Sequence, residues 1–557
     1  MNRAVRRRRH RRRSHRTWLA GLLVPLLVLL HGGSAGGAPL PEGAAAVGTK
    51  PNIVVVLADD LNSMDLNLFP NIARLRREGT SLTNFIVSDS WCCPSRSTIL
   101  RSQYVHSHGV RTNNPPNGGF QEFHARGLDR STIGTWLRPA GYRTGFVGKF
   151  LNGYPKTAGP TYVPPGWDAW HVPAPRRMYQ QSGYQLIEQG VPVSYGTAPA
   201  DHLDDVLTRK AVSFVQGAPK ATPFFLYVAP IAPHLPATYA IRHAGAFPDA
   251  KAPRTASFNR AVTPLNREPG EREPGKHRLG PADLQVEAGK PGSGAAGLRE
   301  PRWLSGKSKL SAKSIQRIDR IYRDRLRSML SVDDMVGALM KSLRDTGRLR
   351  NTYFFFTSDN GFHLGQHRLP PGKTTPFEED IRVPMLVRGP GVRAGGTMSA
   401  MAGTVDLAPT FAHLAGARIP AFAEGRPLTP LLRGRKPARW RRAMLVEFYA
   451  GRAKHNPEGQ DCDTRPKRGR GCPLPPTYAA LRTGRYTYVE YVTGERQLFD
   501  LAADPYQLRN LVADPALIGK GRSPKANHVR ARIKRLSAWL KRYRACAGAS
   551  CRQADRG

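Results

Sequence analysis

PNIVVVLADD, residues 51–60, is a short apolar run rich in β-branched residues that ends abruptly in two carboxylates. Such a continuous apolar run is typical of a strand buried on both faces of a parallel sheet. The pattern recurs in TYFFFTSDN, residues 352–360, and in PFFLYVA, residues 223–229, after which the chain runs to His234. Ligands gather beyond the carboxyl ends of strands in open α/β sheets. We therefore expect the polar residues that follow these three strands to converge on one site.

The segments between and after these strands complete the predicted fold. Helical periodicity is clearest at residues 321–343, where we interpret Asp333 and Asp334 as a solvated or capping pair rather than metal ligands. Short strand-like runs follow residue 435, and the chain ends in an amphipathic helix. The predicted fold class is α/β, with a mixed, largely parallel sheet flanked by helices and then a smaller C-terminal antiparallel sheet domain with a terminal helix.

The predicted domain boundaries follow from composition. Residues 51–435 form the large α/β domain, and residues 436–557 form the small C-terminal α+β domain. Residues 266–301 are rich in Pro, Gly and charge without a sustained period, which predicts a flexible surface insertion. With 40% hydrophobic and 23% charged residues, the chain has the composition of a globular protein, which excludes a fibrous or wholly disordered one.

The N-terminus has the pattern of an export signal. Nine arginines and no acidic residue accompany the apolar run WLAGLLVPLLVLL, residues 18–30, which is shorter than the about 20 residues that span a bilayer. We interpret residues 1–38 as a signal peptide and residues 39–50 as the mature N-terminal segment; an uncleaved anchor is the alternative. The predicted location is secreted or in the cell envelope, by a twin-arginine or general secretory route, and the mature protein is not expected to span a membrane.

The formal net charge is +44, and it falls to +35 without the nine N-terminal arginines. The remaining basic residues are scattered, and no recognition motif accompanies them, so the sequence disfavours nucleic-acid binding. This excess of positive charge is also compatible with a secreted protein that binds polyanions and is not an enzyme.

Six cysteines fall into three groups. Cys546 and Cys551 are close enough to form a disulfide, and Cys462 and Cys472 flank a short basic loop that offers a second one. The adjacent Cys92 and Cys93 rarely bridge each other, because the trans peptide between them separates the side chains. This pair needs another explanation.

Hard oxygen donors follow two of the predicted strands: Asp59, Asp60, Asp359 and Asn360. Such a set suits Ca²⁺ or Mg²⁺ better than zinc or copper. The alternative is that each pair caps a following helix or turn. The sequence has no zinc-type Cys/His spacing and no phosphate-binding loop of the G-x-x-x-x-G-K-[ST] type.

Cys92-Cys93-Pro94-Ser95-Arg96 matches C-x-P-S-R, the motif in which sulfatases have their cysteine oxidised to formylglycine. The chain resembles type I sulfatases of the alkaline phosphatase superfamily there and at PNIVVVLADD, GFVGK, APHLP, TSDNGFHLGQH and IRVPMLVRGPG. Through CCPSR, YVHSHGV, GKFLNGY and SMLSVDD it is most similar to the N-acetylglucosamine-6-sulfatase branch. The resemblance implies an alkaline-phosphatase-like fold and hydrolysis of a sulfated carbohydrate or aryl sulfate.

The resemblance also implies roles for individual residues. A hydrated aldehyde at Cys92, made by a formylglycine-generating enzyme, attacks sulfur with one hydroxyl, and loss of the other hydroxyl's proton then expels sulfate. Arg96 holds the modified residue and the metal site, Lys149 and Lys373 hold sulfate oxygens, and His234 protonates the leaving oxygen. The residues implied to bind Ca²⁺, with Mg²⁺ as the alternative, are Asp59, Asp60, modified Cys92, Asp359 and Asn360.

Four further residues are candidates for the sugar pocket: His106, His108, Asn113 and His363. Ordinary structural hydrogen bonding is the alternative for each. Many arylsulfatases carry a histidine two residues after the lysine equivalent to Lys149, where this chain has Leu151, so the base that regenerates the aldehyde is unassigned. A phosphate- or phosphonate-ester hydrolase of the same superfamily is the alternative enzyme.

Overall fold

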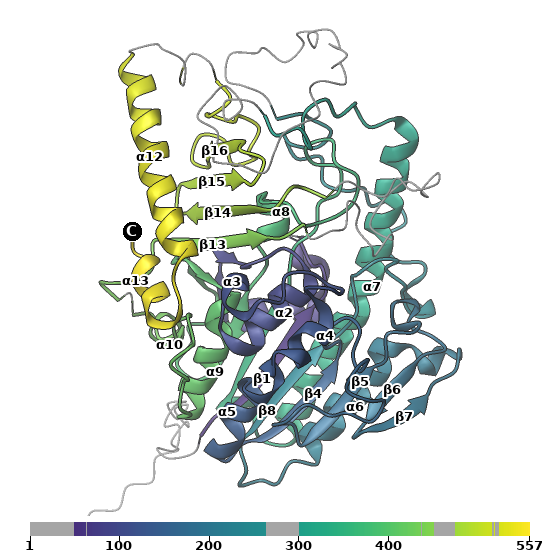
Figure 1. The fold of residues 1–557 in the computed structure, drawn as a ribbon. Coiled ribbons are helices and arrows are strands. Elements are labelled where there is room, and N and C mark those ends of the chain that lie inside the picture. Colours follow the sequence, from purple (N-terminus) through teal and green to yellow (C-terminus); the bar gives the residue numbers. More distant parts are fainter. Residues whose placement is uncertain are drawn as a thin grey trace, which may run out of the picture. The chain divides into compact units, whose positions relative to one another are not determined.

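The computed structural model describes residues 50–62, 64–262, 300–435, 437–450, 474–514, 517 and 523–557 (Figure 1). The predicted signal peptide, almost all of the insertion at residues 266–301 and the pair Cys462–Cys472 lie outside these residues. The described residues belong to one compact unit. A domain boundary at residue 435 stays a prediction.

A ten-stranded mixed sheet forms the centre of the fold, with the order β11-β2-β10-β9-β1-β8-β4-β5-β6-β7. The strands β9, β1, β8, β4 and β5 run parallel, whereas β10 and the hairpin of β6 and β7 are antiparallel to their neighbours. The predicted α/β class is confirmed. The bounds, in chain order, are β1 (Asn52–Ala58), β2 (Thr80–Leu82), β4 (Arg143–Gly148), β5 (Ala169–Pro173), β6 (Gln185–Glu188), β7 (Val191–Ser194), β8 (Phe224–Ala229), β9 (Thr352–Ser358), β10 (Leu386–Arg388) and β11 (Gly396–Met398). A two-stranded sheet pairs β3 (Phe85–Ile86) with β12 (Ala402–Gly403).

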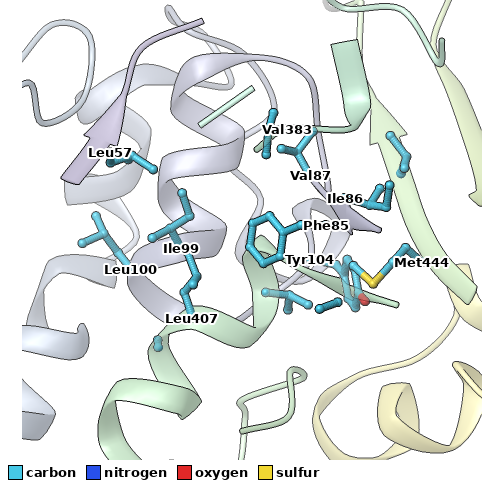
Figure 2. Close-up of a cluster of buried hydrophobic side chains, with 14 of the residues drawn as sticks. Leu57, Phe85, Ile86, Val87, Ile99, Leu100, Tyr104, Val383, Leu407 and Met444 are labelled. Carbon is cyan, nitrogen blue, oxygen red and sulfur yellow. The ribbon is translucent and has the colours of Figure 1, made fainter. Parts of the chain in front are cut away.

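Helices cover both faces of the sheet. In the central strands, the side chains that point to one face and those that point to the other are both apolar. In β1, Val54 and Val56 pack with α1 (Pro70–Glu78), α6 (Leu203–Gln216) and α7 (Ala312–Asp345). Ile53, Val55 and Leu57 point to the opposite face, which α2 (Cys92–Arg101) and α9 (Leu407–Ala415) cover. Figure 2 shows Ile99 and Leu100 of α2 in the same cluster as Leu57 and Leu407. The shorter helices are α3 (Val105–His108), α4 (Gly119–Ala125), α5 (Ile133–Leu137), α8 (Glu378–Ile381) and α10 (Thr429–Leu432).

A separate antiparallel sheet follows residue 442, as predicted. It consists of β13 (Ala443–Phe448), β14 (Tyr478–Thr483), β15 (Tyr486–Tyr491) and β16 (Arg496–Asp500) in sequential order. The long helix α12 (Pro524–Arg544) packs against β13, β14 and β15 through Leu536 and Leu540, and α13 (Cys551–Ala554) ends the chain (Figure 1). The predicted disulfide between Cys546 and Cys551 is present. No described helix is long and apolar enough to cross a membrane.

The capping interpretation of Asp333 is confirmed, but the capped helix is a different one. Asp333 lies on α7 and accepts hydrogen bonds from the backbone N–H of Asn71 (3.2 Å) and Ile72 (2.8 Å) at the start of α1. Asp334 points outward and pairs with Arg242 at 2.8 Å. Neither aspartate belongs to the acidic cluster described below.

Candidate active site

The three strands predicted to end at one site are neighbours in the sheet. Ala58 of β1 aligns with Ser358 of β9, and Val56 of β1 aligns with Val228 of β8. The polar residues that follow these strands therefore meet at one edge: Asp59 and Asp60 after β1, Asp359 and Asn360 after β9, and His234 after β8. All five are buried. The predicted convergence of strand ends is confirmed.

Cys92 joins this cluster as the first residue of α2. Its Sγ lies 3.6 Å from Asp59 Oδ1 and 4.0 Å from Asp60 Oδ1. Ligand atoms of Asp59, Asp60, Cys92 and His234 all lie within 4.8 Å of one another, so this acidic cluster could hold a metal ion. Burial raises the pKa of the Cys92 thiol well above its usual value, although Lys149 and Lys373 oppose the shift.

Two buried lysines reach both the acidic residues and Cys92. Lys149, directly after β4, places Nζ 2.6 Å from Asp59 Oδ2 and 3.5 Å from Cys92 Sγ. Lys373 places Nζ 2.8 Å from Asp60 Oδ1 and 3.0 Å from Cys92 Sγ. Burial opposes ionisation of Asp59, but the charges of Lys149, His234, Arg96 and Lys373 together outweigh it and hold the pKa of that carboxyl far below its usual value. Both ammonium groups therefore lie within reach of an anion bound beside Cys92.

Arg96, one turn into α2, ties the helix to both acidic pairs. Its Nε donates to Asp359 Oδ2 at 2.8 Å, its Nη2 lies 3.4 Å from Asp59 Oδ1, and its Nη1 donates to the carbonyl of Lys149 at 2.8 Å. Burial nevertheless raises the pKa of Asp359 to about 6. A bidentate, permanently charged side chain suits this position, because it fixes two carboxylates relative to the start of α2.

The donor set fits a hard divalent cation. Asn360 donates its Nδ2–H to Asp60 Oδ1 at 2.7 Å, while the buried Asn360 Oδ1 accepts no hydrogen bond from the described residues. A buried carbonyl oxygen without a donor beside three carboxylates is costly in a protein interior unless a cation is its partner. Oxygen-rich sets of this kind favour Ca²⁺ or Mg²⁺.

His234 and Tyr179 form the next layer of the site. His234 Nδ1 lies 2.6 Å from the carbonyl of Leu235, which orients the ring so that Nε2 lies 3.7 Å from Asp60 Oδ2. The ring of Tyr179 stacks on His234 with centroids 4.3 Å apart, and Lys149 Nζ lies 5.0 Å from the Tyr179 centroid. No role for Tyr179 was predicted. Its only sequence signal is an aromatic residue in the irregular segment between β5 and β6.

Arg325, on α7, is hydrogen-bonded to the two loops that follow β1 and β8. Its Nη2 donates to the carbonyl of Asp60 at 2.6 Å and its Nη1 donates to the carbonyl of Pro233 at 2.9 Å. Its guanidinium also lies 4.2 Å from the ring centroid of Phe362. This fully buried arginine therefore connects the loop of a predicted metal ligand to the loop of His234. The sequence analysis did not single it out.

Two of the predicted sugar-binding residues lie beside the site. Asn113 Oδ1 accepts a hydrogen bond at 2.8 Å from the backbone N–H of Cys93, at the start of α2. His363 Nδ1 lies 3.0 Å from Asp380, and its backbone pairs with Gly372, next to Lys373. Cys93 itself is buried and accepts a hydrogen bond at 3.1 Å from the Asn152 backbone N–H.

The other two predicted sugar-binding residues are engaged elsewhere. His108 lies 3.2 Å from Thr98 Oγ1 through Nε2 and accepts from the Val110 N–H through Nδ1, and burial lowers its pKa to about 3. His106 lies 2.8 Å from Glu447 Oε2 and 2.9 Å from the carbonyl of Cys546. The structure thus gives both histidines structural partners, and their substrate contacts stay predictions.

The C-terminal sheet supports the segment that carries Lys373. Tyr478 of β14 donates its hydroxyl hydrogen to the carbonyl of Thr374 at 3.1 Å. Arg482, also on β14, forms a buried ion pair at 2.6 Å with Glu378, the first residue of α8. The position of Lys373 therefore depends on a sheet more than 60 residues further along the chain.

The site combines carboxylates at the ends of parallel strands with two buried lysines and with Cys92, the first residue of α2. Such a combination is typical of a hydrolase that acts on anionic esters. Comparison with known proteins narrows this class. The family model described as Sulfatase matches residues 51–417. Human N-acetylglucosamine-6-sulfatase (Homo sapiens) is 32% identical over 95% of this chain and 90% of its own length. The putative extracellular sulfatase Sulf-1 homolog of Caenorhabditis elegans is 33% identical over 72% of this chain and 53% of its own length.

Solved structures agree on the fold. The structure of BT4656 in complex with its substrate D-glucosamine-2-N,6-O-disulfate superposes with a TM-score of 0.66 at 24% identity, covering 91% of this chain and 99% of that one. This chain belongs to the sulfatase family, whose members hydrolyse sulfate esters.

Proposed function

We propose that the protein releases inorganic sulfate from a sulfated amino sugar, with aryl sulfates as small substrates, after oxidation of Cys92 to formylglycine. The observation that carries this proposal is the position of Cys92. It begins α2 within C-x-P-S-R, and two lysines and two aspartates lie within 4.0 Å of its Sγ. Formylglycine would supply a hydrated aldehyde as the nucleophile, and a divalent cation held by Asp59, Asp60, Asp359 and Asn360 would supply positive charge that favours reaction of the sulfate ester.

The remaining steps belong to side chains of the chain itself. Lys149 and Lys373 bind the sulfate oxygens and stabilise the charge that develops on them as the ester bond breaks. His234, oriented by its hydrogen bond to Leu235, delivers a proton to the leaving sugar oxygen. Arg96 fixes the positions of Asp59 and Asp359 relative to the start of α2. The nucleophile and the cation ligands therefore stay aligned.

The class of substrate and the location follow from the relatives. The human relative is named for 6-sulfated N-acetylglucosamine, and the solved complex holds a disulfated glucosamine. These names support a sulfated amino sugar as substrate. The arginine-rich apolar N-terminus and the nematode relative, which is named extracellular, support a secreted or cell-envelope location. A formylglycine-generating enzyme is the maturation partner.

Mass spectrometry of the Cys92 peptide, combined with matched cysteine variants, tests the proposal. We expect the mass loss that accompanies thiol-to-aldehyde conversion at Cys92. Cys92→Ser should lose turnover of an aryl sulfate by at least about a thousandfold, because a serine would end as a stable sulfated enzyme. Cys93→Ser is the control and should keep turnover, since the Cys93 thiol contacts Asn113 and Asn152, which are not among the proposed cation ligands. Undiminished turnover in Cys92→Ser would overturn the proposal.

Substrate and metal controls complete this test. Paired aryl sulfate and aryl phosphate substrates distinguish a sulfatase from a phosphate-ester hydrolase with the same fold. Removal of divalent cations by a chelator should abolish turnover, and returning Ca²⁺ or Mg²⁺ singly identifies the ion. Faster hydrolysis of the phosphate would replace the proposal with the alternative.

A further inference from the structure

The helix α12 has an unusually one-sided charge. Eight of its 21 residues are Lys or Arg, and none is Asp or Glu. Lys534, Arg535, Lys541 and Arg542 are exposed on the side away from the C-terminal sheet, whereas Leu536 and Leu540 are buried against it. In Figure 1, α12 lies at the margin of the described structure, beside β13–β16. We call these four residues the basic face of α12.

Comparison with α7 shows that this charge is not the usual polar side of a packed helix. α7 also carries eight Lys or Arg residues, but it has five aspartates, and its ion pairs include Arg327–Asp324 and Lys341–Asp345. Among the described residues, the basic face of α12 forms no ion pair. The helix dipole favours cations in the last turn, which accounts for Lys541 and Arg542 but not for Lys534 and Arg535. Clustered like charges on a helix are destabilising unless an anion offsets them.

The C-terminal end of α12 is hydrogen-bonded to α3 and to the residue that precedes it. The hydroxyls of Tyr543 and Tyr104 lie 2.7 Å apart, and the carbonyl of Cys546 lies 2.9 Å from His106 Nε2. The disulfide between Cys546 and Cys551 closes the turn after the helix. These contacts tie the end of α12 to the rest of the protein, so binding of a polymer would require little additional ordering of the helix.

Two arginines extend the basic face toward the active site. Arg111 is exposed and lies 4.8 Å above the ring of Tyr449. Arg544 is exposed as the last residue of α12 and directly follows Tyr543, whose hydroxyl lies 2.7 Å from that of Tyr104. Arg111 is two residues from Asn113, which binds the start of α2 beside Cys92. Positive charge thus continues from α12 toward the residues that flank Cys92.

We propose that the basic face of α12, extended by Arg544 and Arg111, is a docking surface for a sulfated polysaccharide chain whose terminal sugar enters the active site. This inference rests on the proposed function, because a polymer that carries the substrate ester also carries other sulfates. Lys534 and Lys541, like Arg535 and Arg542, are separated by two helical turns, about 10 Å, which suits repeated anions along a chain. A membrane surface fits less well, because the large apolar residues of α12 face the protein and none is exposed.

The test compares two fourfold variants that carry the same change in charge. One replaces the basic face of α12 with glutamate. The other makes the same change at exposed basic residues of other parts of the chain, namely Lys220, Lys313, Arg320 and Arg433. Binding is measured with heparin and with chemically desulfated heparin over a series of salt concentrations. Kinetics are measured with an aryl sulfate and with a sulfated glucosaminoglycan polymer.

We expect the α12 variant to elute from heparin at lower salt than the control and to show a KM for the polymer about tenfold higher, with aryl sulfate turnover unchanged. Desulfated heparin should bind both proteins weakly. Equal binding and equal polymer KM in the two variants would overturn the docking surface. Tighter α12-dependent binding of double-stranded DNA or anionic lipid vesicles than of heparin would also overturn it. Loss of aryl sulfate turnover in the unmodified protein would instead refute the proposed function, so the two failures are distinguishable.

Discussion

Tyr179 contacts two of the side chains that the proposed reaction needs. Its ring stacks on the proposed proton donor, His234, and faces the ammonium of the sulfate-binding Lys149. Stacking and cation–π contacts each contribute about 0.5–1.5 kcal/mol, so together they can hold both groups in the orientation that proton transfer requires. The hydroxyl accepts a long hydrogen bond, at 3.5 Å, from Asn152 Nδ2. Tyr179 is therefore a positioning residue that acts through its ring.

Replacing the ring separates this role from a general loss of structure. We expect Tyr179→Leu to lower kcat for an aryl sulfate about tenfold, because His234 and Lys149 lose the surface that orients them. Tyr179→Phe keeps the ring and should retain nearly full kcat. Tyr179→Leu loses both ring contacts and should unfold at a somewhat lower temperature than Tyr179→Phe, so thermal unfolding is measured to show that both variants are folded at the assay temperature. Equal losses in the two variants would point to the hydroxyl instead.

Individual site residues differ in how far the sequence could predict them. Asp59 and Asp359 directly follow apolar strands, and the end of a parallel strand is a position that the local sequence defines. Cys92 is recognised by its motif. Tyr179 and Arg325 lie on other elements, and only the packing of those elements brings them to His234 and Asp60. The local sequence carries no signal for such contacts.

At the scale of elements, α1 depends on a cap supplied by another helix. Phe69 precedes α1 and offers no side-chain cap, so the first N–H groups of the helix need another acceptor. Asp333 on α7 supplies it for Asn71 and Ile72. The sequence predicted a capping or solvated role for this aspartate but could not identify the capped helix, because the two are more than 260 positions apart.

The neighbouring aspartates offer a matched pair for measuring this cap. Asp333→Ala leaves two N–H groups of α1 without an acceptor, so we expect the free energy of unfolding to fall by about 2 kcal/mol. Asp334→Ala removes a more exposed pair with Arg242 and should cost less than about 1 kcal/mol. Denaturant unfolding of both variants measures the difference. Equal costs would show that the contacts of Asp333 with α1 contribute nothing beyond a surface ion pair.

At the scale of the whole molecule, the C-terminal sheet and the segment after α12 contact the large sheet's active-site loops and hold some of their residues in place. Tyr478 and Arg482 support the Lys373 segment, and Glu447 of β13 and the carbonyl of Cys546 hold His106 on α3. The sequence predicted the antiparallel sheet and the terminal helix correctly. It could not predict these contacts, because strand patterns define elements but not the surfaces on which they pack.

The contact of His106 with Glu447 makes this association depend on pH. Burial disfavours the imidazolium, but the hydrogen bond and charge of Glu447, together with the carbonyl of Cys546 and the charge of Glu424, outweigh burial and raise the pKa of His106 from 6.5 to about 9. A folded-state pKa above the unfolded one contributes stability that is fully present below pH 6.5 and is lost as pH rises through about 9. The shift corresponds to at most about 3 kcal/mol.

His106→Gln tests this linkage and the predicted sugar contact together. The unfolding free energy of the unmodified protein should exceed that of the variant by about 2–3 kcal/mol at pH 6, and the difference should shrink steadily between pH 6.5 and pH 9.5. His528→Gln, at an exposed position of α12, is the control and should show no such trend. If both ring nitrogens of His106 serve the structure, KM for a sulfated glucosamine stays unchanged at pH 7. A difference in stability that is constant with pH, together with a raised KM, would instead assign His106 to the sugar pocket.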